Sequence, residues 1–170
     1  LLYIAVTTDT GCFQYANTNA ATLRAAARLL ELGADNRKIS MDFFRKISRA
    51  RMALVGQIYS GMRFFRGGQV AIAVVTRALI DSVHATEDDC DDIAGLPGRA
   101  EGAVVSVTIR ELLDGRSKIS VRSNPEVDAC AICAVYGGGG HKMASGCTLD
   151  CGTETAVEKI LAAIDQVWPA

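Results

Sequence analysis

The spacing of apolar residues changes near Ser60 and divides the chain into two parts. Before Ser60, residues 17–33 and 41–60 carry apolar positions every three to four residues, so we predict a helix in each segment. Residues 2–8 form a run rich in apolar and β-branched residues, which predicts a strand. The first part therefore predicts a strand, a helix and then a second, longer helix.

After Ser60 the apolar period becomes two, which is typical of half-buried strands. Two hairpins are predicted, with turns at Gly67-Gly68 and at Asp114-Gly115. We also predict a short helix at 85–93, a helix at 125–136 that starts at Pro125, a strand at 144–150 and a terminal helix at 153–167. We predict an α/β chain with a division into residues 1–38, a bridging helix at 39–61, and an α+β part with a mixed sheet and flanking helices at 62–170.

Composition indicates a folded globular chain, with 49% hydrophobic and 22% charged residues. The longest apolar run is far shorter than the ~20 residues that span a bilayer, so we expect no membrane partner. The opening "LLYIAV" lacks a basic region and a cleavage site, so it is not a signal peptide. Because no initiator Met precedes it, we expect the chain to be part of a longer one.

The net charge of −1 conceals an uneven distribution of charge. Residues 24–77 carry eleven Arg or Lys against three acidic residues, whereas residues 81–92 carry acids and no Lys or Arg. A basic segment of this kind can attract phosphates. The alternative is an ordinary solvated helix face, which is common for basic helices.

Two pairs of cysteines have nearly, but not fully, the spacing of a zinc site. Cys130 and Cys133 form C-x-x-C, and Cys147 and Cys151 form C-x-x-x-C. The first pair lies in an alanine-rich helical stretch and the second alternates along a predicted strand, where free cysteine packs as a small apolar residue. We therefore favour reduced thiols in the cytoplasm over structural zinc.

The stretch "YGGGGHKMASG" at 136–146 sets four glycines before His141. Each glycine loses much conformational freedom on folding, so a run of them needs a local reason. One interpretation is a ligand loop in which Gly137–Gly140 direct their amides at an anion, with His141 at the rim; the other is a loose connection. On the predicted strand at 118–122, Arg122 points away from the core and is a candidate phosphate partner, or simply an exposed arginine.

Two stretches of the sequence together carry a resemblance to a known family. "TTDTGCFQYANT" (7–18) and "GGGGHKMASG" (137–146) resemble the DHH phosphoesterase superfamily with its DHH-associated C-terminal domain, in the oligoribonuclease (nanoRNase) and phosphoadenosine-phosphate phosphatase branch. "SVRSN" (120–124) and "GLPGRAEGAV" (95–104) also resemble stretches of that group. The similarity spans nearly the whole chain, so 1–38 would be the C-terminal part of the catalytic domain and 62–170 the associated domain.

The resemblance implies roles for particular residues. Asp9 matches the last metal-binding aspartate of the catalytic domain, for which the family uses two manganese ions. The paired-aspartate and Asp-His-His motifs do not occur in this sequence, so the catalytic set is incomplete and we expect the chain alone to be inactive. Arg99 departs from the family's spacing and its role is left open. The implied substrate-binding residues are Arg122, Ser123, Asn124, Gly137, Gly138, Gly139, Gly140 and His141.

The resemblance implies a cytoplasmic, metal-dependent phosphoesterase that binds nucleic acid and hydrolyses short oligoribonucleotides, phosphoadenosine phosphate or both. Three alternatives stay open: a single-strand nucleic-acid or nucleotide binding module, a cyclic dinucleotide phosphodiesterase, and an editing domain of a tRNA synthetase. The sequence ranks neither the substrates nor the oligomeric states, a homodimer included.

Overall fold

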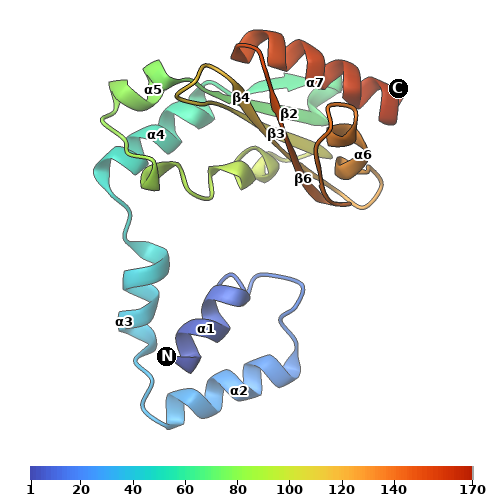
Figure 1. Ribbon diagram of the computed structural model, residues 1–170. Coiled ribbons are helices and arrows are strands. Elements are labelled where there is room, and N and C mark those ends of the chain that lie inside the picture. Colours follow the sequence, from blue (N-terminus) through green and yellow to red (C-terminus); the bar gives the residue numbers. More distant parts are fainter. Residues whose placement is uncertain (170) are drawn as a thin grey trace. The chain divides into compact units, whose positions relative to one another are not determined.

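The computed structural model describes residues 1–169. These residues form two compact units, one over residues 1–47 and the other from Ser48 onward (Figure 1). No helix within residues 1–169 combines the length and the apolar character needed to cross a membrane.

The first unit is made of helices: α1 (Leu2–Asp9), α2 (Ala20–Glu31), α3 (Asn36–Ser40) and a π-helical turn at Met41–Arg45. The predicted strand at 2–8 is therefore wrong. A strand needs a neighbouring strand for its backbone hydrogen bonds, and residues 1–47 contain no strand. The helix satisfies those groups internally, and its threonines adapt: the Thr7 hydroxyl donates to the Tyr3 carbonyl at 2.9 Å.

The helix predicted over 41–60 is interrupted. The backbone of Lys46 is extended, with φ −87° and ψ 122°. A new helix, α4 (Arg49–Ser60), starts after Ser48, whose hydroxyl accepts a hydrogen bond from the Arg51 amide at 2.8 Å. Serine at this position satisfies one of the otherwise unpaired amides of a helix start. A single bridging helix is thus replaced by two helical segments, while the domain limits at 38 and 61 stay a prediction.

The second unit is built on a six-stranded mixed sheet in the order β1-β2-β3-β4-β6-β5. Only β2 and β3 are parallel, and the other neighbours are antiparallel. The two predicted hairpins are β1–β2 and β3–β4, so the mixed sheet with flanking helices is confirmed. The strands are β1 (Arg63–Phe65), β2 (Val70–Val75), β3 (Val105–Glu111), β4 (Ser117–Ser123), β5 (Gly139–His141) and β6 (Ala144–Leu149).

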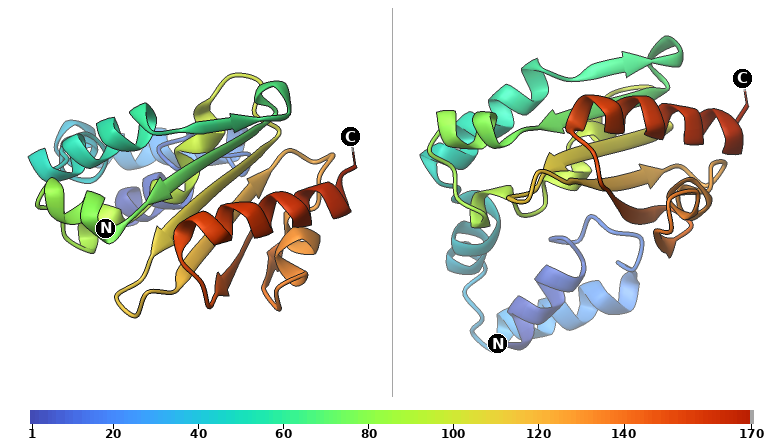
Figure 2. Two further views of the ribbon diagram at one scale, coloured as in Figure 1. Left: turned by 90° about the horizontal axis from the view of Figure 1, so that it is seen from above. Right: turned by 45° about the horizontal axis from the view of Figure 1, so that its top comes forward.

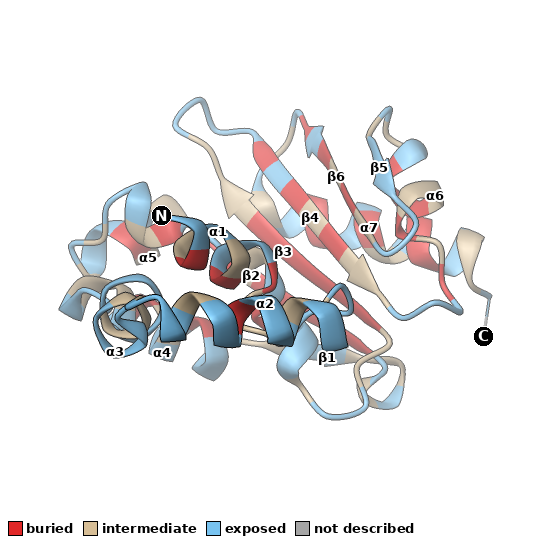
Figure 3. Cartoon of the chain, turned by 90° about the horizontal axis from the view of Figure 1, so that it is seen from below, coloured by how far each residue is buried: buried red, intermediate tan, exposed pale blue. Residues whose placement is uncertain are grey.

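The two faces of this sheet are covered unequally. On one face α6 (Ala129–Ala134) and α7 (Thr153–Val167) pack on apolar residues from β2, β3, β4 and β6, which form the main core (Figure 2). On the other face α4, α5 (Arg77–Ser82) and three 3-10 turns pack on residues of β2 such as Ala73 and Val75. Along β4 and β6, exposed and half-buried residues alternate with buried ones that point to the main core, and all three residues of β5 are exposed (Figure 3). These helices and turns therefore leave that face of β4, β6 and β5 open.

Two helix predictions in this unit need correction. The helix predicted from Pro125 begins at Ala129, because the Asp128 carboxylate caps it by accepting from the Ala131 amide at 3.0 Å. The acidic stretch 85–93 forms 3-10 turns instead of an α-helix. There the Asp89 carboxylate is occupied by the Thr86 amide at 2.9 Å and by the Ser48 hydroxyl at 2.5 Å. The terminal helix and the strand near 144–150 are where the sequence predicts them.

Candidate functional site

The open face of β4, β6 and β5 presents its residues in cross-strand rows. Arg122 lies opposite Ala144, which lies opposite His141 on the edge strand. Adjacent strands are about 4.8 Å apart, so the backbones of Arg122 and His141 are separated by roughly 10 Å, with only a methyl group between them. The register therefore places the two predicted ligand-binding side chains on the same face, on either side of a small residue.

The next row has still smaller side chains. Ser120 lies opposite Gly146, which lies opposite Gly139. Together the rows enclose a hollow of about 500 Å³. Its lining residues are Lys118, Ile119, Ser120, Arg122, Gly139, His141, Ala144, Ser145, Gly146, Cys147 and Thr148. The structure thus brings together Arg122, Gly139 and His141 of the predicted set.

The four consecutive glycines do not share one role. Gly137 has φ +69° and its amide donates to the Ala134 carbonyl at 3.0 Å, which ends α6 in the left-handed conformation that glycine adopts without strain. The Gly138 amide donates to the Cys133 carbonyl at 2.9 Å. Two of the four amides are therefore used within the fold, and a nest of four free amides is not formed. Gly139 and Gly140 belong to β5, an edge strand where the sequence predicts a loop.

Packing separates Gly138 and Gly140 from Gly139. A Cβ atom on Gly138 would lie 2.4 Å from the Gly146 carbonyl oxygen and 2.5 Å from the Cys147 Cβ. A Cβ on Gly140 would lie 2.6 Å from the Ala144 carbonyl oxygen, whereas a Cβ on Gly139 would meet nothing within 4 Å. Close packing against β6 thus requires glycine at two positions, and Gly139 is the glycine of the run that faces the hollow.

Arg122 has no carboxylate partner among residues 1–169. Its guanidinium donates to the backbone carbonyl of Val121 at 3.0 Å. Other arginines of the sheet strands and their hairpin turns are neutralised by acids: the ion pairs are Arg63–Glu154, Arg66–Asp165, Arg110–Glu87 and Arg116–Asp114. The half-buried positive charge of Arg122 is therefore free to bind an anion.

Other predicted ligand residues lie beside the hollow without lining it. The Ser123 hydroxyl donates to the Val127 carbonyl at 2.8 Å, and the backbone N–H of Asn124 donates to the Val104 carbonyl at 2.9 Å. Both contacts hold the turn that follows β4. Arg99 is exposed at the end of a 3-10 turn, Pro97–Arg99. Contact of these residues, or of Gly137, Gly138 and Gly140, with a ligand stays a prediction.

The predicted metal ligand Asp9 lies at the end of α1, in the first unit. Its carboxylate accepts a hydrogen bond from the Asn17 side-chain amide at 3.1 Å. Within residues 1–169, no three His, Cys, Asp or Glu side chains are grouped so that they could hold a metal ion. The described residues therefore do not amount to a manganese site.

A pair of thiols behind the hollow was not predicted from the sequence. All six cysteines are free. Cys133 of α6 and Cys147 of β6 are buried in the main core, and their hydrogen bond lowers the pKa of Cys133, against the opposing effect of burial. The positive charge of Arg122 adds to this lowering, while the same hydrogen bond and burial raise the pKa of Cys147. The C-x-x-C spacing hid this pairing, because it joins Cys133 to a residue of another element.

Comparison with known proteins identifies the family. The model of the DHHA1 domain matches residues 67–168, well over half of the chain. The chain belongs to the DHHA1 domain family. The matched residues include α6, β5, β6 and the whole of the hollow, so the family resemblance noted in the sequence is confirmed for the part that carries the candidate site.

Two curated relatives of the DHHA1 chain share its sequence over most of its length. The bifunctional oligoribonuclease and PAP phosphatase NrnA of Thermus thermophilus is 40% identical over 161 residues, which cover 94% of this chain and 47% of the relative. NrnA of Mycoplasma genitalium is 34% identical over 146 residues, or 86% of this chain and 44% of the relative. The chain spans about half the length of the curated relatives it matches.

A solved structure supports the fold. The crystal structure of an exopolyphosphatase-related protein from Bacteroides fragilis superimposes with a TM-score of 0.85 at 26% identity, over 94% of this chain and 47% of that protein. The DHHA1 chain therefore shares its mixed α/β architecture with that solved protein.

Proposed function

We propose that this DHHA1 chain is the substrate-binding part of a DHH-family phosphoesterase that hydrolyses short oligoribonucleotides, phosphoadenosine phosphate or both. The observation that carries the proposal is Arg122, which has no carboxylate partner within residues 1–169 and lies across Ala144 from His141, beside Gly146 and Gly139. Both NrnA relatives are named as bifunctional oligoribonuclease and PAP phosphatase, which supports the choice of substrate.

The chemistry of the hollow suits the phosphate group of a nucleotide, with room for the rest of the nucleotide against the strands. A guanidinium can bind two phosphate oxygens at once, and an imidazole can donate a hydrogen bond in either protonation state. The Ser120 hydroxyl adds a donor or acceptor on the floor. Because Gly139 and Gly146 have no side chains, a ligand can approach the backbone of the two strands closely.

We also propose that the whole protein acts in the cytoplasm and uses manganese. The free thiols support a reducing compartment. Asp9 is the only residue of the expected ligand set that the resemblance places in this chain. We expect the whole protein to release mononucleotides from short RNA in the presence of manganese, and the 170-residue chain alone to release none. Release by the isolated chain, measured by chromatography, would contradict this division of labour.

A stacking site for single-stranded nucleic acid is less well supported. Such sites use aromatic platforms on which successive bases stack. Apart from His141, the residues that line the hollow include no aromatic side chain. The hollow therefore favours recognition of phosphate over recognition of base faces.

The phosphate requirement gives a direct test on the 170-residue chain. We expect adenosine monophosphate to bind and plain adenosine to bind at least about tenfold more weakly, because a charge-assisted contact contributes roughly 1.5–3 kcal/mol. Binding of the monophosphate should also weaken between low and high salt, since screening reduces the attraction of exposed charges. Isothermal titration of both ligands at two ionic strengths measures this. Equal affinities for the two ligands, insensitive to salt, would show that the hollow is not a phosphate site.

A further inference from the structure

A second cation lies on the same face as Arg122, at the far end of the hollow. Lys118 is exposed, lines the hollow, and lies opposite Thr148 of β6. Lys118, Ser120 and Arg122 alternate with the buried Ile119 and Val121, so all three side chains project from the open face.

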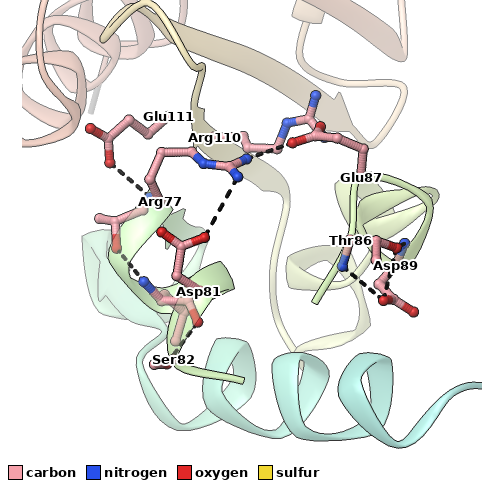
Figure 4. A network of polar contacts seen from close by, with 10 residues as sticks. Arg77, Asp81, Ser82, Thr86, Glu87, Asp89, Arg110 and Glu111 are labelled. Carbon is pink, nitrogen blue, oxygen red and sulfur yellow. Dashed lines mark hydrogen bonds and ion pairs between the residues drawn. The ribbon is translucent and has the colours of Figure 1, made fainter. Parts of the chain in front are cut away.

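No acid neutralises Lys118 within residues 1–169. Its cross-strand neighbour on β3 is another cation, Arg110. Arg110 pairs with Glu87 at 3.3 Å, and Glu87 also pairs with Arg77 (Figure 4). The Glu87 carboxylate is therefore already shared by two arginines.

The charge of Lys118 is therefore left without a partner in the part of the chain that the structure describes. The charge of Arg110, opposite it on β3, is taken up by Glu87, so Lys118 is the unpaired cation of this row. An anionic group bound in the hollow would supply the missing partner, so the local charge arrangement favours a ligand with negative charge at the Lys118 end as well.

The spacing of the two cations decides what kind of ligand reaches both. Lys118 and Arg122 are four positions apart along β4, which corresponds to about 13 Å between their backbones. One phosphate group is too small to be held by both side chains when these stand perpendicular to the sheet. A ligand with two or more phosphates along a chain can reach Arg122 and Lys118 together.

We propose that Lys118 is a second phosphate anchor that makes the hollow prefer oligonucleotides of two or three residues over a mononucleotide. The proposal rests on the proposed function, in which Arg122 and His141 hold the first phosphate. Ser120 and Gly146 between the two anchors leave room for the sugar that connects successive phosphates. Lys118 is thus a residue that determines specificity for chain length.

The test compares 5′-phosphorylated adenylates of one, two and three residues on the 170-residue chain. The variants are Lys118→Met, Arg122→Met and, as a matched control, Lys159→Met, which removes an exposed lysine from α7 on the opposite face. We expect Lys118→Met to bind the mononucleotide with an affinity within about twofold of that of the native chain. The longer ligands should bind about fivefold to tenfold more weakly, because the variant loses a charge-assisted contact that solvent weakens at this exposed position. For the longer ligands, the slope of the logarithm of the binding constant against the logarithm of the salt concentration should become shallower by about one in this variant.

The outcomes separate this proposal from the function on which it rests. If Arg122→Met weakens all three ligands while Lys118→Met matches Lys159→Met, the second anchor is refuted and the phosphate site stands. If Lys118→Met weakens the mononucleotide as much as the trinucleotide, both cations serve one phosphate and the length preference is refuted. If neither variant changes binding, both proposals fail. Circular dichroism checks folding, and Lys118→Gln serves as a second neutral variant.

Discussion

Replacing Gly138 with Val is expected to destabilise the second unit by about 3 kcal/mol or more. The new Cβ would lie within 2.5 Å of the Gly146 carbonyl oxygen and the Cys147 Cβ, and 3.0 Å from the Cys133 carbonyl oxygen. Two of these atoms belong to backbone and the third is fixed by β6, so none can move aside as the end of a flexible side chain would. Denaturant unfolding followed by circular dichroism measures the loss.

Gly139→Val is the matched control, because it makes the same change one residue along the chain. A Cβ on Gly139 meets nothing within 4 Å, and φ there does not lie in the left-handed region. We expect an unfolding midpoint close to that of the native chain, together with weaker binding of adenosine monophosphate as the new side chain enters the hollow. Equal stability of the two variants would contradict the close packing of Gly138 against β6. Native affinity in Gly139→Val would contradict the placement of the ligand.

Much of the second unit could be predicted because its signals are local. The alternation around Ile119 and Val121 predicts which face Arg122 occupies, and the structure confirms that face. The Gly-Gly and Asp-Gly turns predict both hairpins, since Gly67, Gly68 and Gly115 adopt the positive φ that tight turns require. A period of two and a turn residue require no knowledge of the rest of the fold.

The failures concern features that depend on distant partners. Residues 2–8 have the composition of a strand, but the first unit offers no neighbouring strand and they form α1. The separate roles of the four glycines depend on how closely α6 and β6 approach β5, which no local pattern reveals. The unpaired charge of Lys118 was also missed. It follows from the position of Arg110 opposite Lys118 and from the ion pair between Arg110 and Glu87, which the sequence around Lys118 does not reveal.

Replacing Arg122 with Met is expected to weaken binding of adenosine monophosphate about tenfold to a hundredfold, which corresponds to the loss of a contact of roughly 1.5–3 kcal/mol. Methionine keeps an unbranched apolar stem over the sheet and removes the guanidinium. Because Arg122 has no ion pair within residues 1–169, the free energy of unfolding should change little. Titration calorimetry and denaturant unfolding report the two quantities separately.

Arg116→Met is the control for this loss. Arg116 directly precedes β4, the strand that carries Arg122, and has the same charge. It pairs with Asp114 at 2.8 Å and does not line the hollow. Removing it changes the net charge equally, so an effect of overall charge alone would weaken binding in both variants to the same degree. A loss confined to Arg122→Met assigns the phosphate to the row of Arg122, Ala144 and His141. An equal loss in both would mean that the affinity arises from the field of the whole domain, and the hollow would no longer be the site.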